Sequence, residues 1–207
     1  MNGWRRLYHP RIAFVGAACW LMSAGAAWAH SPWKQLGEFH EGLLHPLFDL
    51  EHVALLLGTA LLAAQGGRGR ARSYLAWVLG GGTAAWLLTS TGIWNWDPGP
   101  RPVVPALLLL VAGGLAAVAR PVPDRIPHAL GMIAAGWVVL ATGSEVSAET
   151  SPWVRGGGAV VTVGYLSLLG TAASARGLRT WTWAPLALRV AGSWIGALGL
   201  LLLALRI

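Results

Sequence analysis

Two histidines and two carboxylates, His45, Asp49, Glu51 and His52, lie close together at the start of a long apolar segment. Imidazole nitrogens and carboxylate oxygens are ligands that suit divalent transition metals such as nickel, cobalt, zinc and copper. Ionisable side chains are costly inside membrane spans, and those that occur there usually bind or move an ion. These residue types, in this setting, predict a site for a divalent metal.

On a continuous helix, most of these groups would share one face. A helix turns by about 100° per residue, so a single stripe would contain Glu38, Glu41, His45, Asp49 and His52. Glu51 would point about 80° to the other side, where it would face a neighbouring helix or orient a histidine. Pro46 disfavours a continuous helix, because proline breaks a helix interior. A helix that begins near Pro46 would still keep Asp49 and His52 adjacent.

A second interpretation is that these polar groups lie among lipid headgroups, as many helix ends do. This interpretation accounts for Glu38, His40 and Glu41. It fits His52 poorly, because His52 lies about 10 Å further along the helix axis than His45. We therefore predict metal ligands at His45, Asp49, Glu51 and His52. Capture of the metal at the outer face is predicted for His30, Glu38, His40, Glu41 and Glu145.

The composition is that of a polytopic membrane protein. Of the 207 residues, 55% are hydrophobic and 11% are charged, whereas soluble domains carry about 25% charged residues. Each apolar run is near the roughly 20 residues that a helix needs to cross a bilayer. We predict an all-α bundle of six transmembrane helices in one domain, residues 30–207, with spans at Leu43–Ala64, Ser73–Trp94, Val103–Ala119, Ile126–Gly143, Trp153–Ala175 and Leu186–Leu205.

Residues 1–29 have the pattern of a secretory signal peptide. Arg5 and Arg6 precede an apolar core, Ile12–Met22, and Ala27–Ala29 forms an A-x-A cleavage site. Cleavage would leave His30 at the mature N-terminus, and an uncleaved anchor helix is the alternative. The single cysteine of the chain lies in this segment, so the sequence predicts neither a disulfide framework nor a thiolate metal site.

The arginines lie mostly in alternate loops. The loops between the first and second, third and fourth, and fifth and sixth predicted spans contain Arg68, Arg70, Arg72, Arg120, Arg125, Arg176 and Arg179. Positive residues gather in cytoplasmic loops, so both termini of the mature protein are predicted to face the periplasm from the bacterial inner membrane. The net charge of +7 thus reflects membrane orientation, and no nucleic-acid partner is predicted.

Small residues recur within the predicted spans, as Gly80-Gly81-Gly82, Gly113-Gly114, Gly156-Gly157-Gly158, and Gly192 with Gly196. Glycines let transmembrane helices approach closely, and this is the interpretation that we favour. The triple glycines could instead leave room for a passage or a broken helix.

The segment Gly42-Leu43-Leu44-His45-Pro46-Leu47-Phe48-Asp49-Leu50-Glu51-His52 resembles the HupE/UreJ family of small bacterial membrane proteins, regarded as nickel or cobalt permeases that serve hydrogenase and urease. The family pattern in the first span is roughly HPxxGxDH, so Glu51 replaces its aspartate and Asp49 replaces its glycine. The family typically carries a second motif, HGxAHGxE, in the fourth span. The nearest match here, Ala141-Thr142-Gly143-Ser144-Glu145, keeps the glycine and glutamate and lacks the histidines.

The resemblance implies a secondary permease or binding protein for nickel or cobalt, with zinc and copper as further candidates. The missing histidines favour an alternative, a non-transporting membrane protein that docks with a metalloenzyme or assembly factor. No phosphate-binding GxxxxGK[ST] loop, GxSxG motif or HExxH motif is present, so neither ATP hydrolysis nor an enzyme is predicted. The expected partners are the metal ion, the lipid bilayer and the enzyme or factor named above. No tightly bound cofactor is predicted, and the oligomeric state is left open.

Overall fold

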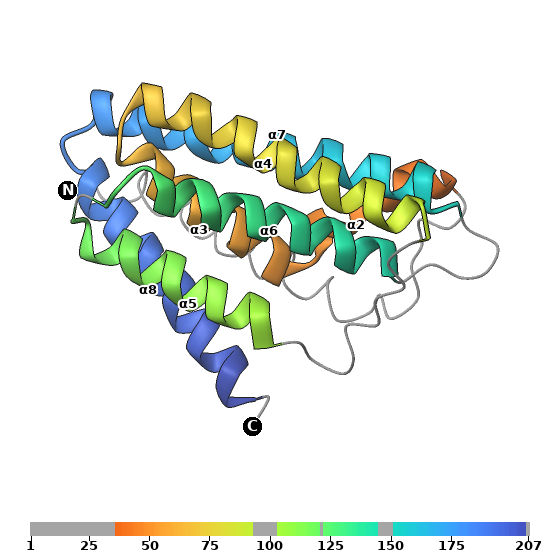
Figure 1. Ribbon diagram of the computed structural model, residues 1–207. Coiled ribbons are helices and arrows are strands. Elements are labelled where there is room, and N and C mark those ends of the chain that lie inside the picture. Colours follow the sequence, from red (N-terminus) through yellow and green to blue (C-terminus); the bar gives the residue numbers. More distant parts are fainter. Residues whose placement is uncertain (1–35, 93–102, 121, 145–150, 206–207) are drawn as a thin grey trace, which may run out of the picture. The chain divides into compact units, whose positions relative to one another are not determined.

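The computed structural model describes residues 36–92, 103–120, 122–144 and 151–205, and the regular structure of these residues is entirely helical (Figure 1). The predicted all-α class is confirmed. The proposed signal peptide, residues 1–29, lies outside the described residues. The helices are α2 (Glu38–Phe48), α3 (Leu50–Ala64), α4 (Arg68–Ser90), α5 (Val103–Val118), α6 (Arg125–Ser144), α7 (Pro152–Thr180) and α8 (Ala184–Ala204).

Each of the six predicted spans overlaps a helix of the structure, but fewer helices have the length and apolarity of a membrane span. Three of them do, namely Arg125–Gly143, Pro152–Thr180 and Ala184–Ala204. The pair α2 and α3 is a fourth candidate if the two are counted as one broken span. Helix α5 is apolar but only 16 residues long. Helix α4 includes Arg68, Arg70, Arg72 and three consecutive glycines, which lower its hydropathy. Among the residues that the structure describes, three to four spans are thus supported by length and composition.

Helix α3 is the central helix of the described part of the chain. It contacts each of the six other described helices. Apart from Glu51, His52 and Thr59, its sequence is apolar on every side, as expected for a helix that is surrounded by protein, and Leu55, Leu56 and Leu62 have no exposed surface. Two of the residues predicted to bind metal, Glu51 and His52, lie in the first turn of α3. The fold therefore places them on the helix that has the most neighbours.

Glycines form the closest contacts between helices. A Cβ atom added at Gly42 of α2 would lie 1.9 Å from the carbonyl oxygen of Arg155, and one added at Gly158 of α7 would lie 2.3 Å from that of Phe39. Gly81 approaches α6, and Gly113 approaches α8, in the same way. Helices α4 and α7 continue through their triple glycines. These glycines therefore act in packing, as favoured above, and do not break the helices that contain them.

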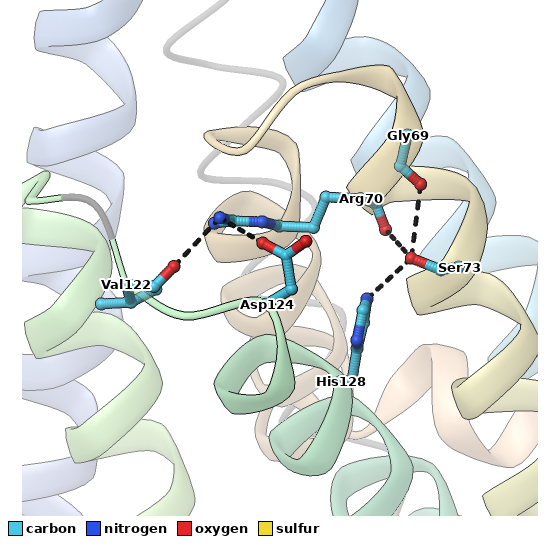
Figure 2. A network of polar contacts seen from close by, with 6 residues as sticks. All are labelled: Gly69, Arg70, Ser73, Val122, Asp124 and His128. Carbon is cyan, nitrogen blue, oxygen red and sulfur yellow. Dashed lines mark hydrogen bonds and ion pairs between the residues drawn. The ribbon is translucent and has the colours of Figure 1, made fainter.

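Polar contacts join the start of α4 to the start of α6, as Figure 2 shows. The guanidinium of Arg70 pairs with the carboxylate of Asp124 and donates to the carbonyl of Val122 at 3.0 Å. The Ser73 hydroxyl forms a hydrogen bond with Nε2 of His128 at 2.8 Å. His128, in the first turn of α6, thus connects this helix to α4.

Candidate metal site

The first predicted span is broken at Asp49. Helix α2 ends at Phe48, α3 begins at Leu50, and the two are bent by 71°. Asp49 has an extended backbone, with φ −88° and ψ 109°, and its side chain accepts hydrogen bonds from the backbone N–H groups of Glu51 and His52. Aspartate is a favoured N-cap because its carboxylate satisfies these otherwise unpaired donors.

The continuous stripe from Glu38 to His52 considered above is therefore wrong. The interruption comes from the capping carboxylate of Asp49, three residues after Pro46. Pro46 itself is buried inside α2 and does not begin a helix. Aspartate is among the most favoured N-cap residues, so the sequence could have suggested this cap.

The break brings three of the four predicted ligands together. His45 lies on α2, Asp49 at the junction and His52 in the first turn of α3, and one ligand atom from each lies within 4.8 Å of the other two. Nδ1 of His52 is 3.5 Å from Oδ2 of Asp49, and the two imidazole rings have centroids 5.9 Å apart. Two ligand atoms on one transition-metal ion are at most about 4.2 Å apart, twice a bond of 2.1 Å. A small inward movement of these side chains would complete such a site.

The three ligands are buried to different degrees, which gives the site an inner and an outer side. His52 is only 4% exposed, whereas the side chain of Asp49 is 38% exposed. Nδ1 of His52 has no hydrogen-bond partner within the described ranges. Buried polar atoms nearly always have such a partner. A metal approaching past Asp49 would give this nitrogen one.

The remaining predicted residues have other contacts or are not described. Glu51 is half-buried on α3 and is not one of the three grouped ligands. One oxygen of Glu38 accepts from the backbone N–H of Ser151 at 3.0 Å. Nδ1 of His40 forms a hydrogen bond with the carbonyl of Leu36 at 2.8 Å. His30 and Glu145 lie outside the described residues.

Arg155 is a buried charge that the sequence-based interpretation overlooked. It lies in the first turn of α7, is 4% exposed, and places Nη1 3.7 Å from Oε1 of Glu41. About two turns further along α7, the hydroxyl of Thr162 donates to the carbonyl of Leu43. These contacts fasten α2, and with it His45, to α7. The sequence did contain an indication of this buried charge. Arg155 is a single arginine inside an otherwise apolar predicted span, and it is followed by glycines that let another backbone approach.

Buried hydroxyl groups continue the polar face of α3 beyond His52. Thr59 follows seven residues later, which places it within about 20° of His52 around the helix and about 10 Å further along. Thr59 is fully buried, and its hydroxyl lies 2.8 Å from that of Tyr74 on α4, which is also fully buried. The interior next to α3 therefore contains polar groups at two positions along the helix axis, at His52 and at Thr59.

Comparison with known proteins identifies the family of this chain. No curated protein and no solved structure matches it. The family model described as HupE / UreJ protein matches residues 18–202, which is most of the chain and includes every described helix up to the last turn of α8. The resemblance seen around His45 and His52 therefore extends over nearly the whole sequence, and the chain belongs to the HupE/UreJ family.

Proposed function

We propose that this protein binds a divalent transition metal, nickel or cobalt in the first place, at His45, Asp49 and His52 and carries it across the bacterial inner membrane. The family is associated with nickel and cobalt transport or with accessory roles for urease and hydrogenase, and it is not a family of enzymes. The observation that carries the proposal is the grouping of three ligand atoms within 4.8 Å at a broken apolar helix.

The broken helix suits a transported cation. Discontinuous helices in transporters expose backbone carbonyls at the end of the first half, and these partial negative charges attract cations. Here α2 ends beside the ligands, and the carboxylate of Asp49 offsets the positive end of α3. A set of three protein ligands also leaves coordination positions for water or a further ligand, as in exchangeable metal sites. Transport requires such a site, because a permanently closed one would retain the ion.

The orientation proposed above would place the ligands toward the periplasmic face. It is supported by the arginines in alternate loops and by the apolar helices. A membrane potential of about 100 mV, negative inside, supplies about 4.6 kcal/mol for inward movement of a divalent cation. Uptake could therefore run without ATP. A C-terminal fusion to a reporter that is active only in the periplasm tests this orientation.

Replacing Asp49 with asparagine separates its two roles. Asparagine caps a helix about as well as aspartate, so the Asp49→Asn protein should keep its thermal stability. It lacks the anionic oxygen, and the affinity for Ni²⁺ or Co²⁺ should fall by at least about tenfold. Asp49→Ala should lose the same affinity and, in addition, about 1 kcal/mol of stability. Calorimetric titration and thermal unfolding of the purified proteins measure both quantities. Unchanged affinity in Asp49→Asn would remove Asp49 from the site.

Reconstitution of the purified protein in liposomes distinguishes a transporter from the alternative, an accessory protein that does not transport. The described part of α6 contains a single histidine, His128, which lies at the start of that helix beside Ser73, so the fourth span adds no imidazole of its family motif. For a transporter, liposomes containing the purified protein should accumulate Ni²⁺ or Co²⁺ when an inside-negative potential is imposed. An accessory protein would bind the metal and leave the flux at the level of empty liposomes.

A further inference from the structure

A cavity lies between α4 and α7, far from the candidate metal ligands. It has a volume of about 550 Å³. Arg155 and Arg176 are on α7 at opposite ends, about 32 Å apart along the helix axis. This distance is close to the thickness of a bilayer's hydrocarbon core, about 30 Å. Arg176 lines the cavity, so the cavity lies one membrane thickness away from the end where α7 contacts α2.

Three arginines line this cavity. Arg72 comes from α4, whereas Arg176 and Arg179 come from the last turns of α7. All three are exposed, and within the described ranges none of them forms an ion pair. Arg70, which directly precedes the cavity residue Ala71, differs in this respect, because it is held by Asp124 and Val122 (Figure 2). The cavity thus concentrates positive charge that no carboxylate of the described chain neutralises.

The rest of the lining is apolar or hydroxylic. Leu75, Leu168 and several alanines form the apolar wall, and Thr180 lies beside the arginines. Leu168 is 51% exposed and therefore faces the surroundings of the protein as well as the cavity. A ligand for this cavity must combine an anionic group with an apolar part. An anionic phospholipid has this combination in its phosphate group and its acyl chains. A guanidinium group can donate two parallel hydrogen bonds to a phosphate, and an acyl chain can pack against leucine side chains.

We infer that this cavity binds the phosphate group of an anionic phospholipid. Arg72, Arg176 and Arg179 contact the phosphate, and Leu75 and Leu168 contact the first segment of an acyl chain. Basic pockets between transmembrane helices are a known form of headgroup site. The inference requires that α7 spans the bilayer, as its length and apolarity suggest, and it does not depend on the metal site.

The test uses the full-length protein in neutral detergent. Short-chain phosphatidylglycerol is titrated in, and bound molecules are counted by native mass spectrometry, with short-chain phosphatidylcholine and inorganic phosphate as separate probes. The cavity variant is Arg176→Gln with Arg179→Gln. The matched control is Arg120→Gln with Arg125→Gln, which removes two exposed arginines outside the cavity, one after the end of α5 and one at the first residue of α6.

The cavity variant should bind phosphatidylglycerol about tenfold more weakly, and the control should bind it as the unmodified protein does. Replacing Arg176 and Arg179 with lysine keeps the charges but loses the paired hydrogen bonds, so an intermediate loss is expected. Metal affinity should be unchanged in all of these variants, so a failure here is distinguishable from a failure of the proposed function. Equal effects of both glutamine variants, or no effect of either, would overturn the inference. Binding of inorganic phosphate, but not of phosphatidylglycerol, would reject the lipid as the source of the phosphate.

Discussion

Replacing His52 with alanine is expected to abolish high-affinity binding of Ni²⁺ or Co²⁺, with a loss of more than about 100-fold. His52 is the most buried of the three grouped ligands, and its Nδ1 has no hydrogen-bond partner within the described helices. Removing groups that only orient a ligand already costs 10- to 100-fold in metal affinity, so loss of a ligand should cost more. Titration of the purified protein, and metal accumulation by cells that express it, measure the effect.

His128 provides the matched control for this experiment. It is a histidine at the start of α6 that forms a hydrogen bond with the hydroxyl of Ser73, and it belongs neither to the grouped ligands nor to the residues predicted to capture metal. His128→Ala should therefore change metal affinity by less than about twofold. Because His52→Ala could also leave a cavity, His52→Asn should be measured beside it for thermal unfolding. A folded His52→Asn protein that binds metal normally would refute the proposed site.

Replacing Gly158 with alanine is expected to destabilise the protein by about 3 kcal/mol. The added Cβ would lie 2.3 Å from the carbonyl oxygen of Phe39 and 2.7 Å from the amide nitrogen of Leu43. Both are backbone atoms of α2, so no side-chain rotation relieves the contact, and α2 must move away from α7. His45 would move with it, and metal affinity should fall together with the midpoint of thermal unfolding.

Gly157 is the neighbouring position at which the same substitution should be harmless. A Cβ atom there would lie 3.7 Å from the ring of Trp86, an ordinary van der Waals distance. Alanine also has a better helix propensity than glycine by about 1 kcal/mol. Gly157→Ala should therefore be neutral or stabilising in thermal unfolding. If the two variants behave alike, the close approach of α2 and α7 is wrong.

The sequence predicted the parts of this protein that depend on local pattern. Long apolar runs with short loops predicted the all-α fold, and the pattern around His45 and His52 was sufficient to suggest the family that the comparison then identified. The glycine runs predicted close packing, but not which glycine of each run makes the contact. That depends on the rotation of the helix about its axis. A Cβ atom added at Gly81 would clash with the carbonyl oxygen of Met132, whereas one added at its neighbour Gly80 would have no atom within 4 Å.

The features that were missed depend on competition between local and tertiary forces. An aspartate in an apolar segment can continue a helix or cap a new one. Here its side chain accepts hydrogen bonds from the backbone N–H groups of Glu51 and His52, and these bonds favour a new helix that begins after Asp49. Arg155 was overlooked, because only the approach of Glu41 from α2 makes it a buried paired charge. The six spans remain a prediction, because α4 and α5 are too polar or too short to qualify on length and composition alone.

The two imidazoles of the candidate site belong to differently anchored pieces of backbone. His45 lies on α2, which is fastened to the beginning of α7 by Glu38, Glu41 and Gly42, whereas His52 lies on the central helix α3. The distance between the two imidazoles is therefore set by how α2 packs against α7 as well as by the two histidines. Substitutions where α2 contacts α7 would change this distance and, with it, the ionic radius that the proposed site favours.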